Sequence, residues 1–117
     1  ISHMVGAEYN THHGRTNAIV LPVVLRCNLP TMEEKVKRMS DAMQFDDHSV
    51  ESFISNIEKI LDRIQIPQSL SEIGVPESCA ARIAEKAMKD LAYATNPRLA
   101  TFEEVHELVL ASIKKAR

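Results

Sequence analysis

ISHMVGAEYNTHHGRTNAIVLPVVLRCN, residues 1–28, holds three of the five histidines, two of the three glycines and the longest apolar run of the chain. The apolar run predicts a helix over residues 12–27, which Pro22 interrupts because proline removes an i→i−4 hydrogen bond. Asn10 and Thr11 precede this helix, and their side-chain oxygens are expected to cap it. Residues 1–9 are expected to be the end of another helix. The opening stretch therefore favours an all-α fold.

The three histidines of this stretch, His3, His12 and His13, raise the question of a metal site, because imidazole is the commonest metal ligand near neutral pH. Nine residues separate His3 from His13, too many for the i, i+4 pairing of one helical face, so the two would have to meet through the fold. Adjacent helical residues diverge by about 100°, so only one of His12 and His13 faces a shared centre. Gly14 favours His13, because a glycine beside a ligand permits close approach.

Helical periodicity continues through the rest of the chain. Helices are predicted over residues 31–44, 49–65 and 76–93, and from Thr101 to near the end, with inward-facing positions from Cys79 to Leu91 in the third. No segment has the pattern of a strand, and five or six helices with short connections predict one all-α, bundle-like domain over residues 1–117. Capping boxes of the S/T-x-x-E type are expected at Thr31 with Glu34, Ser69 with Glu72, and Thr101 with Glu104.

Composition excludes several classes of function. The 14 Lys and Arg are interspersed with 16 Asp and Glu, so neither nucleic acid nor an anionic membrane is an expected partner. The longest apolar run is far shorter than the roughly 20 residues that span a bilayer. Cys27 and Cys79 form no C-x-x-C motif, which favours a reducing, cytoplasmic compartment. No glycine-rich loop is present to hold a pyrophosphate, so the chain alone has no dinucleotide site.

Residues 2–24 resemble the second signature of the iron-containing (group III) alcohol dehydrogenases. That family writes it as H-A-x-x-H, then nine residues, then H-G-x-x-N-A-I-x-L-P-x-V. Two weaker matches follow in family order, so that the resemblance extends over most of the chain. They are IPQSLSEIGV at residues 66–75 and an A-x-x-D-x5-N-P-R ending formed by Ala87, Asp90, Asn96, Pro97 and Arg98.

The resemblance implies a set of site residues. In the family, a divalent metal lies between two domains beside NAD or NADP, held by one Asp and three His; it is usually Fe²⁺, and Zn²⁺ or Mn²⁺ in some members. His13 matches the last of these metal ligands. His3 matches a histidine that lies near the nicotinamide and substrate and helps to relay a proton, which makes it the candidate catalytic and cofactor-binding residue. The other ligands belong to family segments that precede Ile1, one of them two residues upstream.

The resemblance also implies a fold and a function. The chain is expected to be the detached C-terminal helical domain of the iron-dependent alcohol dehydrogenase and dehydroquinate synthase-like fold, separated from its N-terminal nucleotide-binding domain. With that partner domain, it is expected to interconvert a primary alcohol and an aldehyde with NAD or NADP, as a homo-oligomer. The chain alone is expected to be inactive. In the family pattern, residues 92–96 border the substrate pocket.

Two alternatives stay open. A free-standing helical domain that binds a partner chain through an exposed apolar patch is the competing function. Ser2, His3 and Met4 also match the residues that an expression vector leaves before a cloned insert. The spacing from His3 to His13 and the unusual Ile1 favour the interpretation that these residues are native.

Overall fold

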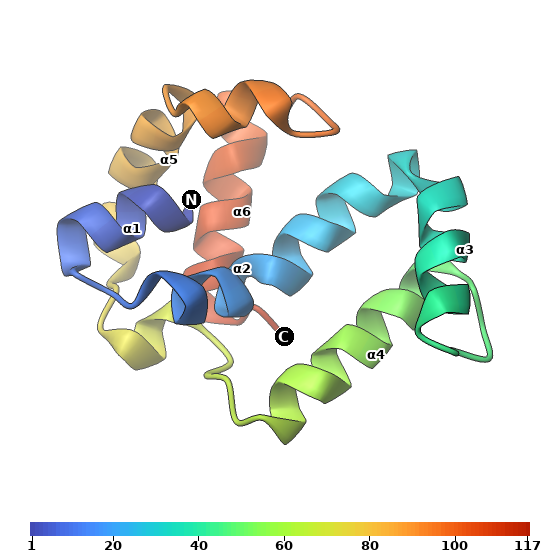
Figure 1. Ribbon diagram of the computed structural model, residues 1–117. Helices are drawn as coiled ribbons and strands as arrows, with labels where there is room; N and C mark the ends of the chain where they lie inside the picture. The colour runs from blue at the N-terminus through green and yellow to red at the C-terminus, as the bar shows by residue number, and fades with distance from the viewer.

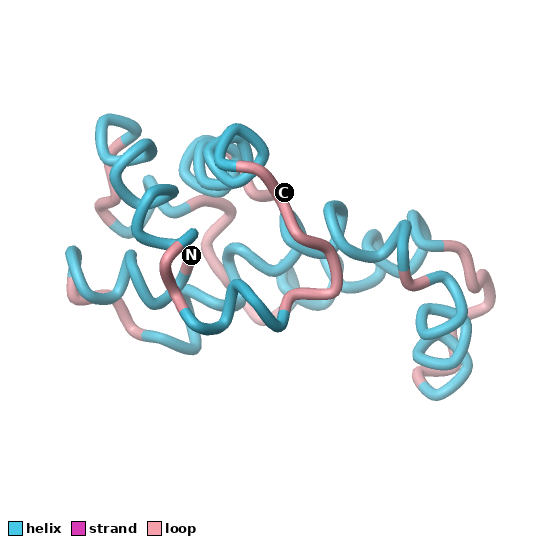
Figure 2. The backbone as a smooth tube through the Cα atoms, turned by 90° about the horizontal axis from the view of Figure 1, so that it is seen from above, coloured by secondary structure: helices cyan, strands magenta, loops and turns pink.

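The chain folds as an all-helical structure, as the sequence predicts. The computed structural model describes the backbone of residues 1–117 and every side chain except those of Leu91 and Ala92. Figure 2 shows helices and loops and no strand over the described chain. None of the helices that these residues form is long and apolar enough to cross a membrane. In order, the elements are α1 (Ser2–Tyr9), α2 (His13–Asn28), the 3₁₀ helix η1 (Leu29–Thr31), α3 (Glu33–Ala42), α4 (Val50–Arg63), the 3₁₀ helices η2 (Leu70–Ile73) and η3 (Glu77–Cys79), α5 (Ala80–Met88), the 3₁₀ helix η4 (Leu91–Thr95) and α6 (Phe102–Lys114).

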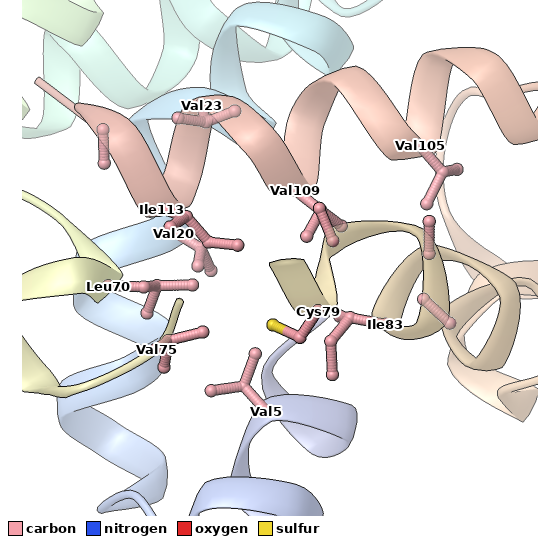
Figure 3. Packing of buried hydrophobic residues seen from close by; sticks show 14 of the residues in the cluster. Val5, Val20, Val23, Leu70, Val75, Cys79, Ile83, Val105, Val109 and Ile113 are labelled. Atoms are coloured by element: carbon pink, nitrogen blue, oxygen red, sulfur yellow. The ribbon is translucent and has the colours of Figure 1, made fainter. Parts of the chain in front are cut away.

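The main core lies among α1, α2, α5 and α6. Its members on α6 recur every four residues, so that one face of the helix is apolar, and α5 supplies small residues that let the two helices approach closely. Figure 3 shows these side chains converging from several elements, with Val5 of α1 reaching the cluster opposite α6. The buried residues include Val5, Ile19, Val20, Leu70, Val75, Cys79, Ile83, Ala84, Val105, Val109 and Ile113.

A second hydrophobic cluster lies around the C-terminal half of α2. It joins η1, α3 and α4 through the buried side chains of Leu29, Val36, Phe53 and Ile54. In Figure 1, α3 and α4 stand to the right of the body formed by α1, α5 and α6, and α2 runs from one part to the other. We call η1, α3 and α4 together the arm. α2 contributes buried residues to the main core and packs the partly buried Leu25 against the second cluster.

Two of the three expected capping boxes are confirmed. Ser69 with Glu72 caps η2, and Thr101 with Glu104 caps α6. The prediction for Thr31 was wrong, because Leu29 is buried in the second cluster and draws residues 29–31 into η1. The Thr31 hydroxyl donates to the carbonyl of Asn28 at 2.7 Å instead of accepting from α3. α3 begins after Met32 with no side-chain cap.

The expected cap of α2 was also wrong. Asn10 takes a left-handed conformation, with φ 52°, and ends α1, since its N–H donates to the carbonyl of Gly6 at 3.0 Å. Thr11 accepts a hydrogen bond from the Thr16 hydroxyl at 2.8 Å. The cap is His12, whose Nδ1 accepts from the N–H of Arg15 at 3.4 Å. The first turn of α2 is therefore capped by a histidine ring, where a side-chain oxygen of Asn10 or Thr11 was expected.

The predicted helix over residues 76–93 is divided into η3, α5 and η4. The α-helical part ends at Met88, and the N–H groups of the next two residues bond in the tighter 3₁₀ manner, including Asp90 N to the carbonyl of Ala87 at 3.1 Å. Asp90 therefore stands between α5 and η4. The prediction that Leu91 faces inward lies outside the described side chains.

Candidate functional site

His3 and His13 meet through the fold. α1 carries His3 and packs against α2, which carries His13 in its first turn. The two rings are stacked, with centroids 5.5 Å apart and planes inclined by 14°. The ring of His12 is instead occupied as the cap of α2. The expectation that His3 and one of the adjacent histidines come together is confirmed, and the partner is His13.

The position of His3 depends on how α1 is held. Val5 is fully buried in the main core. On the outer side, Glu8 pairs with two cations of α5, at 2.8 Å from Arg82 Nη2 and 2.6 Å from Lys86 Nζ. Hydrogen bonds from Arg82 and then Lys86 lower the pKa of Glu8 from 4.5 to about 2. An apolar and an ionic contact thus fix α1, and with it His3, to α5.

Asp90 is the nearest acidic partner of His3. Its Oδ2 lies 2.7 Å from Nδ1 of His3, a short distance of the kind found in charge-assisted bonds. The side chain of Asp90 is 14% exposed and that of His3 is 56% exposed. Asp90 is part of the A-x-x-D-x5-N-P-R match, but no role was predicted for it. That match was the signal available, because the two residues are 87 positions apart.

His13 can offer one nitrogen to a metal. Nδ2 of Asn17 lies 3.2 Å from Nε2 of His13, and this amide group donates to Nε2 when the proton of the neutral ring is on Nδ1. A neutral imidazole nitrogen with a lone pair is a suitable metal ligand. Among the described side chains, no group of three or more His, Cys, Asp or Glu is placed to hold a metal ion. Among these described side chains, His13 therefore fits one ligand position of a metal site whose other ligands come from elsewhere.

A cavity of about 500 Å³ borders His3. His3 and Asp90 line its polar part, and apolar side chains of α2 line much of the rest. Tyr93 and Asn96 from the predicted substrate loop, residues 92–96, also line it, whereas the side chain of Ala92 lies outside the described part. The apolar lining from α2 comprises Val20, Leu21 and Val24.

The N-P-R sequence ties this loop to α2. The amides of Asn28 and Asn96 bond reciprocally, each Nδ2 donating to the other Oδ1 at 2.9 Å. Arg98 donates from Nη1 to the sulfur of Cys27 at 3.0 Å and pairs with Glu104. The loop is therefore held against the C-terminal part of α2 and the start of α6, which fixes one wall of the cavity.

Taken together, these features define a class, namely an all-helical domain with a stacked histidine pair, one ring of which, that of His3, lines a cavity. The family model for the Fe-containing alcohol dehydrogenase family, C-terminal, matches residues 1–113. The chain therefore belongs to the Fe-containing alcohol dehydrogenase family and corresponds to its C-terminal domain.

Individual relatives agree with the family assignment. Lactaldehyde reductase of Escherichia coli is 32% identical over 114 residues, covering 92% of this chain and 30% of that protein. Alcohol dehydrogenase 4 of Saccharomyces cerevisiae is 32% identical over 118 residues, covering 99% of this chain and 30% of that protein. A crystal structure of 1,3-propanediol oxidoreductase superposes with a TM-score of 0.89 at 30% identity, covering 96% of this chain and 31% of that one. The chain spans less than a third of the length of these relatives.

Proposed function

We propose that this chain supplies the C-terminal side of the active site of a metal-dependent, NAD- or NADP-linked alcohol dehydrogenase that interconverts a primary alcohol and an aldehyde. The observation that carries the proposal is the His3–His13 pair, because the family resemblance assigns a metal ligand and a proton-relay residue to these two positions. In the structure the two rings are stacked, and His3 lines a cavity.

In this proposal His13 binds the metal through Nε2. The nitrogen carries a lone pair and its partner is the side-chain amide of Asn17, a neutral group that a metal can displace. When bound, a divalent metal, Fe²⁺ or alternatively Zn²⁺ or Mn²⁺, polarises the substrate oxygen, and the nicotinamide exchanges hydride with the substrate carbon. The remaining ligands and the nucleotide site are assigned to the N-terminal nucleotide-binding domain and to the segment joining it to this one.

His3 handles the proton in this proposal. Oxidation of an alcohol releases the hydroxyl proton, and reduction of an aldehyde requires one. His3 lines the cavity with a largely exposed side chain, so a small alcohol or aldehyde in the cavity can reach its ring. The apolar wall from α2 accommodates the carbon chain of such a substrate.

A domain exchange tests the proposal. The C-terminal domain of the Escherichia coli lactaldehyde reductase is replaced by this chain, and bound metal and nicotinamide-linked aldehyde reduction are measured in the hybrid. We expect both to be retained. His13→Ala is expected to abolish metal retention and turnover, whereas His3→Ala lowers turnover by about 10²- to 10⁴-fold with the metal still bound.

The matched control is His12→Ala, because this neighbouring histidine is engaged at the start of α2 and is assigned no ligand role. It should keep the metal. Normal metal content in His13→Ala would remove the central assignment. A folded hybrid that binds no metal and turns over no aldehyde would favour the competing function, a helical domain that binds a partner chain. The proposed partners are otherwise the nucleotide-binding domain and further copies in a homo-oligomer, in a reducing, cytoplasmic setting.

A further inference from the structure

Asp90 occupies a fixed position beside His3. Its backbone N–H donates to the carbonyl of Ala87 at 3.1 Å, and its carbonyl accepts from the N–H of Tyr93 at 3.0 Å. The carboxylate is mostly shielded from solvent, and the ring of His3 reaches it from α1. The stiffer partner in this pair is therefore Asp90, and its geometry determines where the imidazole can lie.

The bond to Asp90 determines which ring nitrogen carries the proton. An ionised carboxylate only accepts hydrogen bonds, so Nδ1 of His3 must donate to Oδ2 at their separation of 2.7 Å. In the neutral ring the lone pair is then on Nε2. A ring flip would place a carbon atom against the carboxylate and lose the bond. Stacking on His13 restricts the plane of the His3 ring, but both flipped orientations of the ring lie in that plane.

We propose that Asp90 is the positioning residue of His3. Asp90 holds the imidazole in the Nδ1–H tautomer and leaves Nε2 as the nitrogen that accepts a hydrogen bond from the hydroxyl of the substrate. The inference deepens the proposed function and rests on it, since a role for Nε2 toward a substrate requires the dehydrogenase assignment. Carboxylates that hold a functional histidine through its other nitrogen fix both tautomer and orientation in this way.

Two other groups near this pair supply the rival explanations. The first is His13, whose stacked ring could orient His3 by itself. The second is the amino group of Ile1, which is largely buried close to Asp90; burial lowers its pKa and the carboxylate partly opposes that shift. The Ile1 amino group competes with the ring of His3 for the carboxylate, and a ring that it displaced would lose the preference for a proton on Nδ1.

The tautomer is measured directly in the 117-residue chain, labelled with ¹⁵N at histidine, by long-range ¹H–¹⁵N correlation at about pH 8.5, where a free imidazole is neutral. His3→Gln assigns the signals. We expect His3 to carry its proton on Nδ1. Asp90→Asn keeps the size of the side chain but can donate as well as accept, so the Nδ1–H form should lose its dominance. Asp90→Ala should abolish it.

Controls separate Asp90 from the rival groups. Asp62→Asn is the same substitution at an acidic residue that pairs with Arg117, and it should leave the His3 signals unchanged. His13→Ala should keep the Nδ1–H tautomer. A proton on Nε2 in the unsubstituted chain, an unchanged tautomer in Asp90→Asn, or loss of the tautomer in His13→Ala would each overturn the inference.

This measurement uses no metal, nucleotide or turnover, so its failure leaves the dehydrogenase proposal intact, and failure of the domain exchange leaves the tautomer result intact. In an active hybrid, Asp90→Asn should lower kcat about 10- to 100-fold while metal stays bound. The same substitution should cost nothing further in a His3→Ala background. An additive loss in the double variant would assign Asp90 a role that does not pass through His3.

Discussion

The docking of α1 can be tested at Val5, because the position of His3 depends on it. Val5→Ala removes two methyl groups from a side chain that is completely buried. Their transfer costs about 1.6 kcal/mol at roughly 0.8 kcal/mol per group. A residual cavity of about 40 Å³ adds about 1 kcal/mol. The better helix propensity of alanine offsets about 0.5 kcal/mol, so the free energy of unfolding should fall by about 2 kcal/mol.

Urea denaturation followed by far-UV circular dichroism measures this loss, which corresponds to about 8 °C in Tm for a domain of this size. The control is Val24→Ala in α2, since it has the same propensity gain but its side chain is only partly buried and borders the cavity. It should cost less than about 1 kcal/mol. Equal effects of the two substitutions would refute the packing of α1 against the main core.

Three further outcomes are expected. Glu8→Gln should weaken the dependence of the unfolding free energy on acid pH. Because the pKa of Glu8 is lowered in the folded state, its carboxylate contributes fully to stability above about pH 4.5, and this contribution is lost as the pH falls toward about 2. Unfolding measured over an acid pH series tests this, and an unchanged profile would contradict it. Thr101→Ala should cost about 1 kcal/mol of unfolding free energy by urea denaturation, and Thr31→Ala distinctly less, although both residues begin a T-x-x-E sequence. Alanine at Asn28 or Asn96 should cost about 1–3 kcal/mol each, and the double variant less than the sum, with additivity as the opposing result.

Local sequence predicted the helices better than their ends. Apolar runs and periods identified α2 to α6, because each must bury one face, and α1 was expected as the end of a helix. The two T-x-x-E sequences show the limit of such patterns. At Thr101 the pattern caps α6, but at Thr31 burial of Leu29 draws the preceding residues into η1 and turns the hydroxyl elsewhere. The choice was made by tertiary packing, which no window of a few residues contains.

The site was predictable only in part. Periodicity and spacing indicated a possible histidine site, and the family resemblance gave His3 and His13 their expected roles, which stay predictions. The stacking of the two rings follows from how α1 docks, and the contact between His3 and Asp90 joins residues 87 positions apart. Asp90 was visible in a matched motif, yet a motif states which residues recur and not which atoms touch. The use of His12 as a cap was likewise invisible, because histidine is an uncommon choice there.

The division of the chain into two clusters has a consequence for its dynamics. The arm buries its apolar residues in a cluster separate from the one that holds α1 and α5. Local opening of such a unit needs only its own contacts to break. Amide protons of α3 should therefore exchange with solvent before those of α5 and α6, through an excursion that leaves the histidine pair assembled. Substitutions in the arm can then destabilise the arm alone, while the part of the molecule that carries His3, His13 and Asp90 stays folded.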